Sequence, residues 1–224
     1  MDQKVLIPGA IILAGVIVAG AVLYSNLPKN PLLGKEGKGE VIKDGADALK
    51  IQKDDFVLGN PAAKVAIIEY GDFQCPFCGR FFQTAEQEIK DKYVKTGKAV
   101  FSWRDFAFLG EESFRAAEAA RCAGDEGKFW EYHDHLFNSQ RGENEGAFSD
   151  QNLKRFAEEL KLDKTKFNSC FDSGKYRKAV EETSNTGRAV GVNGTPATFV
   201  NGQLISGAQP FPVFQKIIDE ELKK

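Results

Sequence analysis

Two cysteines separated by two residues, Cys75 and Cys78, have the spacing best suited to chemistry in this sequence. Pro76 follows the first of them, and proline fits the first turn of a helix because its missing N–H needs no partner there. A helix that starts at Pro76 places Cys75 among unpaired amide groups, at the positive end of the helix dipole. Cysteines so placed have pKa values of roughly 3.5–7.5. A stabilised thiolate is a good leaving group, so the pattern predicts a readily exchanged disulfide.

The same spacing can also belong to a zinc site, but such a site needs a second pair of ligands. Cys122 and Cys170 are too far apart in the sequence to supply that pair, and His133 and His135 point to different faces of a helix. A purely structural disulfide is disfavoured as well, since a bridge across two residues constrains little of the unfolded chain. We therefore expect redox chemistry at the cysteine pair, with no metal and no cofactor.

The elements that position this pair can be read from hydrophobic periodicity. Residues 65–70 form a strand-like run directly before the motif, and a helical pattern with apolar residues at three- and four-residue steps follows it. Residues 99–103 alternate as a second strand, so the strand, helix and strand predict a right-handed parallel crossover. The order around the cysteines is therefore β-α-β.

The remainder of the chain reads first as helical and then as a short hairpin. Residues 109–189 are helical in pattern throughout. Residues 197–200 and 203–206 read as two strands joined by the turn Asn201-Gly202, and a last helix is expected over residues 212–222. The sequence thus predicts β-α-β, a helical block, and β-β-α.

Composition places the chain among ordinary globular proteins with room for one sizeable domain. It has 224 residues, of which 42% are hydrophobic and 28% charged, and its net charge is −2. This charge provides no electrostatic footprint for nucleic acid or for an acidic membrane surface. Four cysteines are too few for a disulfide-stapled scaffold.

The N-terminal segment has the properties of a membrane span. Residues 5–24 carry no charge and, as a helix at about 1.5 Å per residue, would cross about 30 Å, the core of one bilayer. A cleavable signal peptide is the alternative, because Ala19-Gly20-Ala21 resembles a cleavage site. We expect an uncleaved signal anchor over residues 1–24, a flexible linker over 25–54 and a folded domain over 55–224. Since disulfide chemistry persists outside the cytoplasm, the domain is expected on the extracytoplasmic side of the cell membrane.

This element order, with a Cys-Pro-X-Cys motif after the first core strand, resembles the thioredoxin fold and specifically the DsbA-type thiol–disulfide oxidoreductases. The loop at residues 191–196 resembles the cis-proline loop of that family, and residues 127–134 resemble a segment of its membrane-anchored members. The resemblance implies an α/β thioredoxin-like fold, a central mixed sheet flanked by helices, with a helical insertion at about 109–190. One N-terminal transmembrane helix would precede it.

The resemblance also implies roles for individual residues. Cys75 would be the nucleophile and Cys78 its resolving partner. The bond between Thr195 and Pro196 would be cis, although only about 5–6% of such bonds are, and would leave the Thr195 backbone free to pair with an extended substrate. Glu69 occupies the position of a buried carboxylate that exchanges protons with Cys78; an exposed strand glutamate is the alternative.

Phe77 departs from the pattern of the family, whose strongly oxidising members carry a histidine between the cysteines. Without an imidazolium there, only helix amides and the helix dipole remain to stabilise the thiolate, which leaves the oxidising strength open. An exposed Phe77 could instead help hold apolar, unfolded substrates, or it could simply pack.

Cys122 and Cys170 both lie in the helical block. In an oxidising compartment they could bridge two helices, and we favour this structural disulfide. The alternative is two independent buried thiols that behave as small apolar residues.

The function expected from these features is that of a membrane-anchored thiol–disulfide oxidoreductase, acting as a dithiol oxidase on reduced secreted proteins. It would need a quinone-linked redox partner in the membrane, as similar systems have. A reductase or isomerase of the same fold is one alternative. A non-catalytic holdase or a copper-delivery module is another, although no methionine-rich segment accompanies the cysteines.

Overall fold

The polypeptide builds a single five-stranded sheet with helices on both faces and a helical block inserted between strands. The structure, a computed structural model, describes residues 47–224. In chain order its elements are η2 (Asp47–Leu49), β1 (Phe56–Leu58), β2 (Val65–Gly71), α2 (Pro76–Phe81), η3 (Phe82–Glu86), α3 (Gln87–Ile89), η4 (Lys90–Val94), β3 (Ala99–Asp105), α4 (Glu111–Gly124), α5 (Phe129–Asn138), α6 (Asp150–Glu159), α7 (Lys164–Asp172), α8 (Arg177–Ala189), β4 (Ala197–Val200), β5 (Gln203–Ser206) and α9 (Phe211–Lys223).

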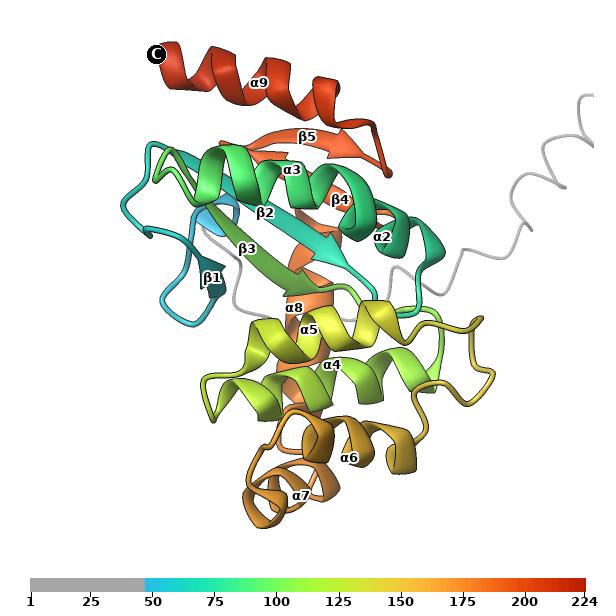
Figure 1. The fold of residues 1–224 in the computed structure, drawn as a ribbon. Coiled ribbons are helices and arrows are strands. Elements are labelled where there is room, and N and C mark those ends of the chain that lie inside the picture. Colours follow the sequence, from blue (N-terminus) through green and yellow to red (C-terminus); the bar gives the residue numbers. More distant parts are fainter. Residues whose placement is uncertain (1–46) are drawn as a thin grey trace, which may run out of the picture. The chain divides into compact units, whose positions relative to one another are not determined.

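The sheet has the strand order β1-β3-β2-β4-β5 (Figure 1). β2 and β3 are parallel, whereas β4 runs antiparallel to β2 and β5 returns antiparallel to β4. Asn201 and Gly202 both have positive φ, as a two-residue hairpin turn requires. The mixed sheet and the hairpin confirm the element order predicted from the sequence.

One strand, β1, was not predicted. It pairs antiparallel with β3 at the edge of the sheet and has three residues, too few for an alternating pattern to be recognised. Leu49 and Ile51, in the predicted linker, pack against the buried cluster that contains Tyr70 and Phe199. Residues 47–54 therefore contact the sheet instead of extending away from it.

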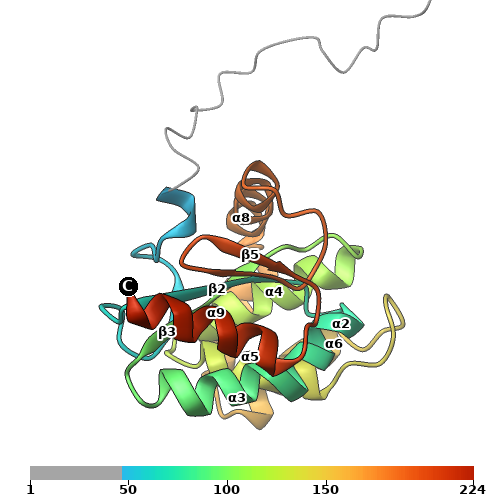
Figure 2. The same ribbon diagram turned by 90° about the horizontal axis from the view of Figure 1, so that it is seen from above.

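Both faces of the sheet are covered (Figures 1 and 2). On one face α2, η3, α3 and η4 follow one another as one long helix beside α9, and Ile67, Phe81 and Phe214 are buried together there. On the other face α8 approaches closely, because a Cβ atom on Gly187 would lie 2.9 Å from both Tyr70 and Phe106. The absence of a side chain at Gly187 thus lets α8 lie directly against the sheet.

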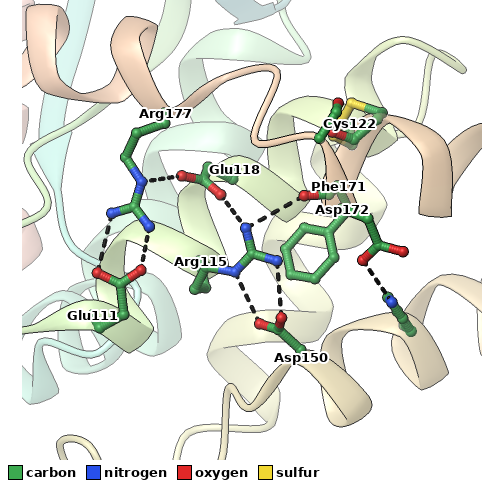
Figure 3. Close-up of polar contacts among 11 residues, drawn as sticks. Glu111, Arg115, Glu118, Cys122, Asp150, Phe171, Asp172 and Arg177 are labelled. Atoms are coloured by element: carbon green, nitrogen blue, oxygen red, sulfur yellow. Dashed lines mark hydrogen bonds and ion pairs between the residues drawn. A yellow bond between two sulfur atoms is a disulfide. The ribbon is translucent and has the colours of Figure 1, made fainter.

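The inserted helices α4–α8 are joined by buried ion pairs as well as by an apolar core (Figure 3). Glu118 of α4 is buried and lies between two guanidinium groups, with 2.5 Å from its Oε1 to Arg177 Nε. Arg115 contacts its other oxygen and also pairs with Asp150 at 2.8 Å. These contacts connect α4, α6 and α8.

A disulfide between Cys122 and Cys170 adds a covalent link between α4 and α7. The two residues are 48 positions apart. Of the two alternatives left by the sequence, the structure therefore has the bridge and not two separate thiols.

Replacing both Cys122 and Cys170 by alanine is expected to lower the free energy of unfolding by about 4 kcal/mol, because a bridge of this span removes much of the entropy of the unfolded chain. Urea unfolding of the oxidised proteins measures the change. A Cys75→Ala/Cys78→Ala variant is the control, since that pair closes a far shorter loop. A loss below about 1 kcal/mol, the range of ordinary substitutions, would contradict the expectation.

The predicted membrane anchor at residues 1–24 and most of the predicted linker, residues 25–46, lie outside the described residues. Among residues 47–224, no helix combines the length and the apolar composition needed to cross a membrane.

Candidate active site

The Cys75 loop connects the end of β2 to the start of α2. Cys75 is the N-cap of α2, with extended backbone angles (φ −67°, ψ 120°), and Pro76 occupies the first turn. The turn before it is fixed by the Cys75 amide, which donates to the Asp72 carbonyl at 3.0 Å. Asp72 Oδ1 in addition accepts from the Gln74 amide at 2.9 Å. The loop therefore presents Cys75 at the beginning of the helix, as the position of Pro76 predicts.

Both cysteines are free thiols in the structure, and both are buried. A hydrogen bond from the Cys78 thiol lowers the pKa of Cys75 to about 6, although burial opposes the shift. The Thr195 side chain and the amides of Cys78 and Phe77 act in the same direction. Cys75 is thus a thiolate at neutral pH.

Cys78 behaves in the opposite way. Burial raises its pKa well above the ordinary value, and the hydrogen bond it gives to Cys75 and the charge of Glu69 raise it further. The two sulfurs therefore differ sharply: one is stable as an anion at the helix start, and the other needs a proton whenever it is not bonded to sulfur.

The loop before β4 lies against Cys75. The Thr195–Pro196 peptide is cis, and Cys75 Sγ lies 3.4 Å from the Thr195 carbonyl oxygen. Pairing of β4 with β2 places this loop beside the cysteines. The structure thus brings together Cys75, Cys78, Thr195 and Pro196, which the sequence proposed for one site.

Glu69 lies inside the protein on β2, and neither of its carboxylate oxygens has a hydrogen-bond partner. Burial raises its pKa well above the ordinary value, and the nearby Glu86 carboxylate raises it further, while Lys90 opposes the shift. Of the two readings of Glu69, buried acid or exposed strand residue, the buried one is correct. The charge of Glu69 acts on Cys78, so a proton exchange between this buried acid and the Cys78 thiol is chemically feasible.

Two further charged residues of this region, Glu86 and Lys90, were missed in the sequence. They face inward from the long helix, and Lys90 Nζ lies 2.5 Å from Glu86 and 3.5 Å from Asp134 of α5. The Asp134 side chain is about half exposed, at 47%. The four-residue step from Glu86 to Lys90 was the available signal, but that spacing is equally common on exposed helix faces.

His133 packs among aromatic rings, with Trp103 and Phe137 both 4.9 Å from it between ring centroids. Its Nδ1 lies 2.9 Å from Asp134. Glu86, His133 and Asp134 can bring ligand atoms within 4.8 Å of one another. However, the Lys90 ammonium pairs with the carboxylates of Glu86 and Asp134. These carboxylates therefore already share a fixed positive charge, which a metal ion would otherwise provide.

Exposed aromatic residues border the cysteines. Phe77, between them, is 51% exposed, and the Arg80 guanidinium lies over its ring at 5.0 Å. Phe108, which was not singled out in the sequence, is 43% exposed and follows β3. Its amide donates to the Asp72 carboxylate at 2.9 Å, so Asp72 connects this segment to the turn before Cys75. The sequence left open whether the Phe77 side chain is exposed or packed, and the structure has it exposed.

Comparison with known proteins agrees with this geometry. The family model described as thioredoxin matches residues 52–220. The probable disulfide bond formation protein D of Bacillus anthracis is 30% identical over 217 residues, covering 95% of this chain and 93% of that protein.

Solved structures are similar as well. The oxidised BdbD of Bacillus subtilis aligns with a TM-score of 0.71 and 26% identity, covering 75% of this chain and 92% of that one. Wolbachia pipientis α-DsbA1 aligns with a TM-score of 0.71 at 23% identity, over 80% and 96% of the two chains. The similarity to Wolbachia pipientis α-DsbA1 supports the fold alone.

Proposed function

Because the chain belongs to the thioredoxin-like, DsbA-type family of thiol–disulfide oxidoreductases, we propose that it oxidises pairs of thiols in unfolded secreted proteins. The observation that carries the proposal is the contrast between the two sulfurs, with the pKa of Cys75 lowered to about 6 and that of Cys78 raised. A thiolate stabilised in the reduced protein makes the disulfide form a stronger oxidant.

The reaction consists of two exchanges. A substrate thiolate attacks Cys75 Sγ, the Cys75–Cys78 bond breaks, and Cys78 leaves and takes up a proton, which Glu69 would supply. The second substrate thiolate then attacks the substrate sulfur of the mixed disulfide, and Cys75 leaves as a stable thiolate. Two electrons pass from the substrate dithiol to the protein, which is left reduced.

Substrate binding is proposed at the surface around Cys75. The backbone of Thr195 beside Pro196 would pair with an extended client segment, while the exposed rings of Phe77 and Phe108 would hold apolar side chains of an unfolded chain. Neither contact requires a particular sequence in the client, which suits an enzyme with many substrates.

The setting of the reaction follows from the apolar N-terminal run. We propose that residues 1–24 anchor the protein in the cell membrane, with the catalytic domain on the extracytoplasmic side. A quinone-linked membrane protein would reoxidise the cysteines. Names such as disulfide bond formation protein D among the relatives support action on folding proteins.

The test is oxidation of a reduced, unfolded protein with two cysteines by the oxidised full chain. We expect one client disulfide to form for each Cys75–Cys78 pair that is reduced. Cys78→Ala should instead accumulate a mixed disulfide through Cys75 when it meets a client disulfide, because no second thiol releases it; Cys75→Ser is the control that should form none. A client that stays reduced beside the oxidised wild-type protein would contradict the proposal.

A further inference from the structure

The loop between α5 and α6 contacts the backbone of the Cys75 loop through one side chain, Gln140. Its amide Nε2 donates to the Phe73 carbonyl at 2.6 Å and to the Cys75 carbonyl at 3.1 Å. Gln140 belongs to the inserted helical block, whereas both acceptors belong to the sheet-to-helix connection. One side-chain amide therefore joins the insertion to the peptide unit that carries the nucleophile.

The oxygen of the same side-chain amide lies against Gly79, in the first turns of α2. A Cβ atom on Gly79 would come within 2.2 Å of Gln140 Oε1. Gly79 has an ordinary helical conformation, so the backbone itself does not require glycine there. The missing side chain instead leaves the space that Gln140 occupies.

A second contact joins the α5–α6 loop to Gln74, the residue between Phe73 and Cys75, whose carbonyls Gln140 binds. The Asn144 amide donates to Gln74 Oε1 at 2.6 Å, and Gln74 Nε2 donates to Ser113 Oγ at 2.9 Å. This contact places the α5–α6 loop close to Gln74, so Gln140 is held near its acceptors by the surrounding structure.

We propose that Gln140 is a positioning residue for the thiol–disulfide exchange, holding the backbone of Phe73 and Cys75 so that the Cys75 sulfur stays at the start of α2. The inference rests on the proposed function. Its first readout, the titration of the Cys75 thiolate, can be measured whether or not that function holds. Nothing in the Cys75 motif itself supplies this contact.

The physical reason lies in the Cys75 carbonyl, which accepts the Gly79 amide at 3.1 Å in addition to the Gln140 amide. These two donors fix the orientation of the peptide between Cys75 and Pro76. If the Gln140 donor is lost, only the Gly79 amide holds this carbonyl, so the peptide can turn further and move the sulfur away from the amides that stabilise its anion. The effect acts through geometry, because Gln140 donates to the carbonyls of Phe73 and Cys75 and not to a sulfur.

The first test replaces Gln140 by leucine, which keeps the bulk and removes the side-chain amide. In reduced full-length protein, the midpoint of the Cys75 thiolate titration is expected to rise by about one pH unit. The equilibrium constant for oxidation of glutathione by the protein disulfide is then expected to fall about tenfold, because one pH unit of thiolate stability corresponds to a factor of ten. Gln151→Leu, at an exposed position of α6, is the matched control and should match wild type in both.

A second variant reaches the same contact from the opposite side. Gly79→Ala would ordinarily favour a helix, but here its methyl group should push Gln140 away and produce the same rise in midpoint. The double variant Gly79→Ala/Gln140→Leu should shift no further than either single one, because both changes remove one interaction.

The inference would be overturned if both single variants had the titration midpoint and the glutathione equilibrium of wild type. This holds even if their thermal stability fell in the oxidised and reduced forms alike. Failure of the proposed function has a different signature. In that case the wild-type protein itself would not oxidise a reduced client, while the Gln140 titrations would still report on the positioning.

Discussion

Glu69→Gln is expected to slow closure of the Cys75–Cys78 disulfide by about 10²–10⁴-fold, the usual range for loss of a positioned acid or base. To close the bond, Cys78 must lose its proton and attack the mixed disulfide at Cys75. Burial raises the pKa of Cys78 well above its ordinary value, so few thiolates form without a base. Glutamine keeps the shape of Glu69 but cannot accept the proton.

The measurement starts from reduced protein with glutathione attached to Cys75 and follows the release of glutathione as Cys78 attacks. Glu88→Gln is the matched control, because Glu88 lies on the exposed side of the long helix that covers the sheet and pairs with Lys92 at 2.6 Å. Its closure rate should equal that of wild type. Closure of Glu69→Gln at the wild-type rate would show that Glu69 carries no proton in this step.

Stability separates this effect from simple damage to the fold. Since the pKa of Glu69 is raised by folding, its ionisation costs stability, and that loss develops as pH rises from the unfolded pKa through the folded one. Glu69→Gln removes this cost. The variant is therefore expected to be at least as stable as wild type at neutral pH while closing its disulfide far more slowly.

The second large effect is in the pH dependence of the reduction potential. Lowering the pKa of Cys75 to about 6 increases its acid dissociation constant about 300-fold over an ordinary cysteine, whose pKa is about 8.5. The depressed pKa of Cys75 stabilises the reduced protein, and this stabilisation is complete at pH values above the pKa of ordinary cysteine. It is lost as the pH falls through about 6. Reduction should therefore take up one proton above that pH and two below it.

The potential is thus expected to fall by about 30 mV per pH unit above the break and about 60 mV per unit below it, for a two-electron couple. Equilibration with glutathione buffers over a range of pH measures both slopes. Repeating the series with Glu69→Gln removes that carboxyl from the titration. A single slope across the range, with no break near pH 6, would contradict the low pKa of Cys75.

Much of this site could be predicted because its signals are local. Pro76 marks the first turn of α2, and that position alone places Cys75 at the helix start. Asn201-Gly202 specifies a two-residue turn, which fixed both strands of the hairpin. In each case the chemistry of one or two residues determines the backbone next to them.

What was missed depends on contacts between distant segments. Lys90 and Asp134 meet across two helices, and Gln140 reaches a loop 65 positions earlier in the chain. None of these three residues has a local pattern that distinguishes it from a solvent-exposed one. The short edge strand β1 was missed for a related reason, since only its pairing with β3 makes it a strand.

The most direct test of the account is a titration of the reduced protein, following the ultraviolet absorbance of the thiolate in wild type and in Cys75→Ser. We expect one transition with a midpoint near pH 6, absent from the variant, with Cys78 remaining protonated well above it. A midpoint near that of free cysteine, about 8.5, would mean that the start of α2 does not stabilise the Cys75 anion, and the proposed oxidase mechanism would fail.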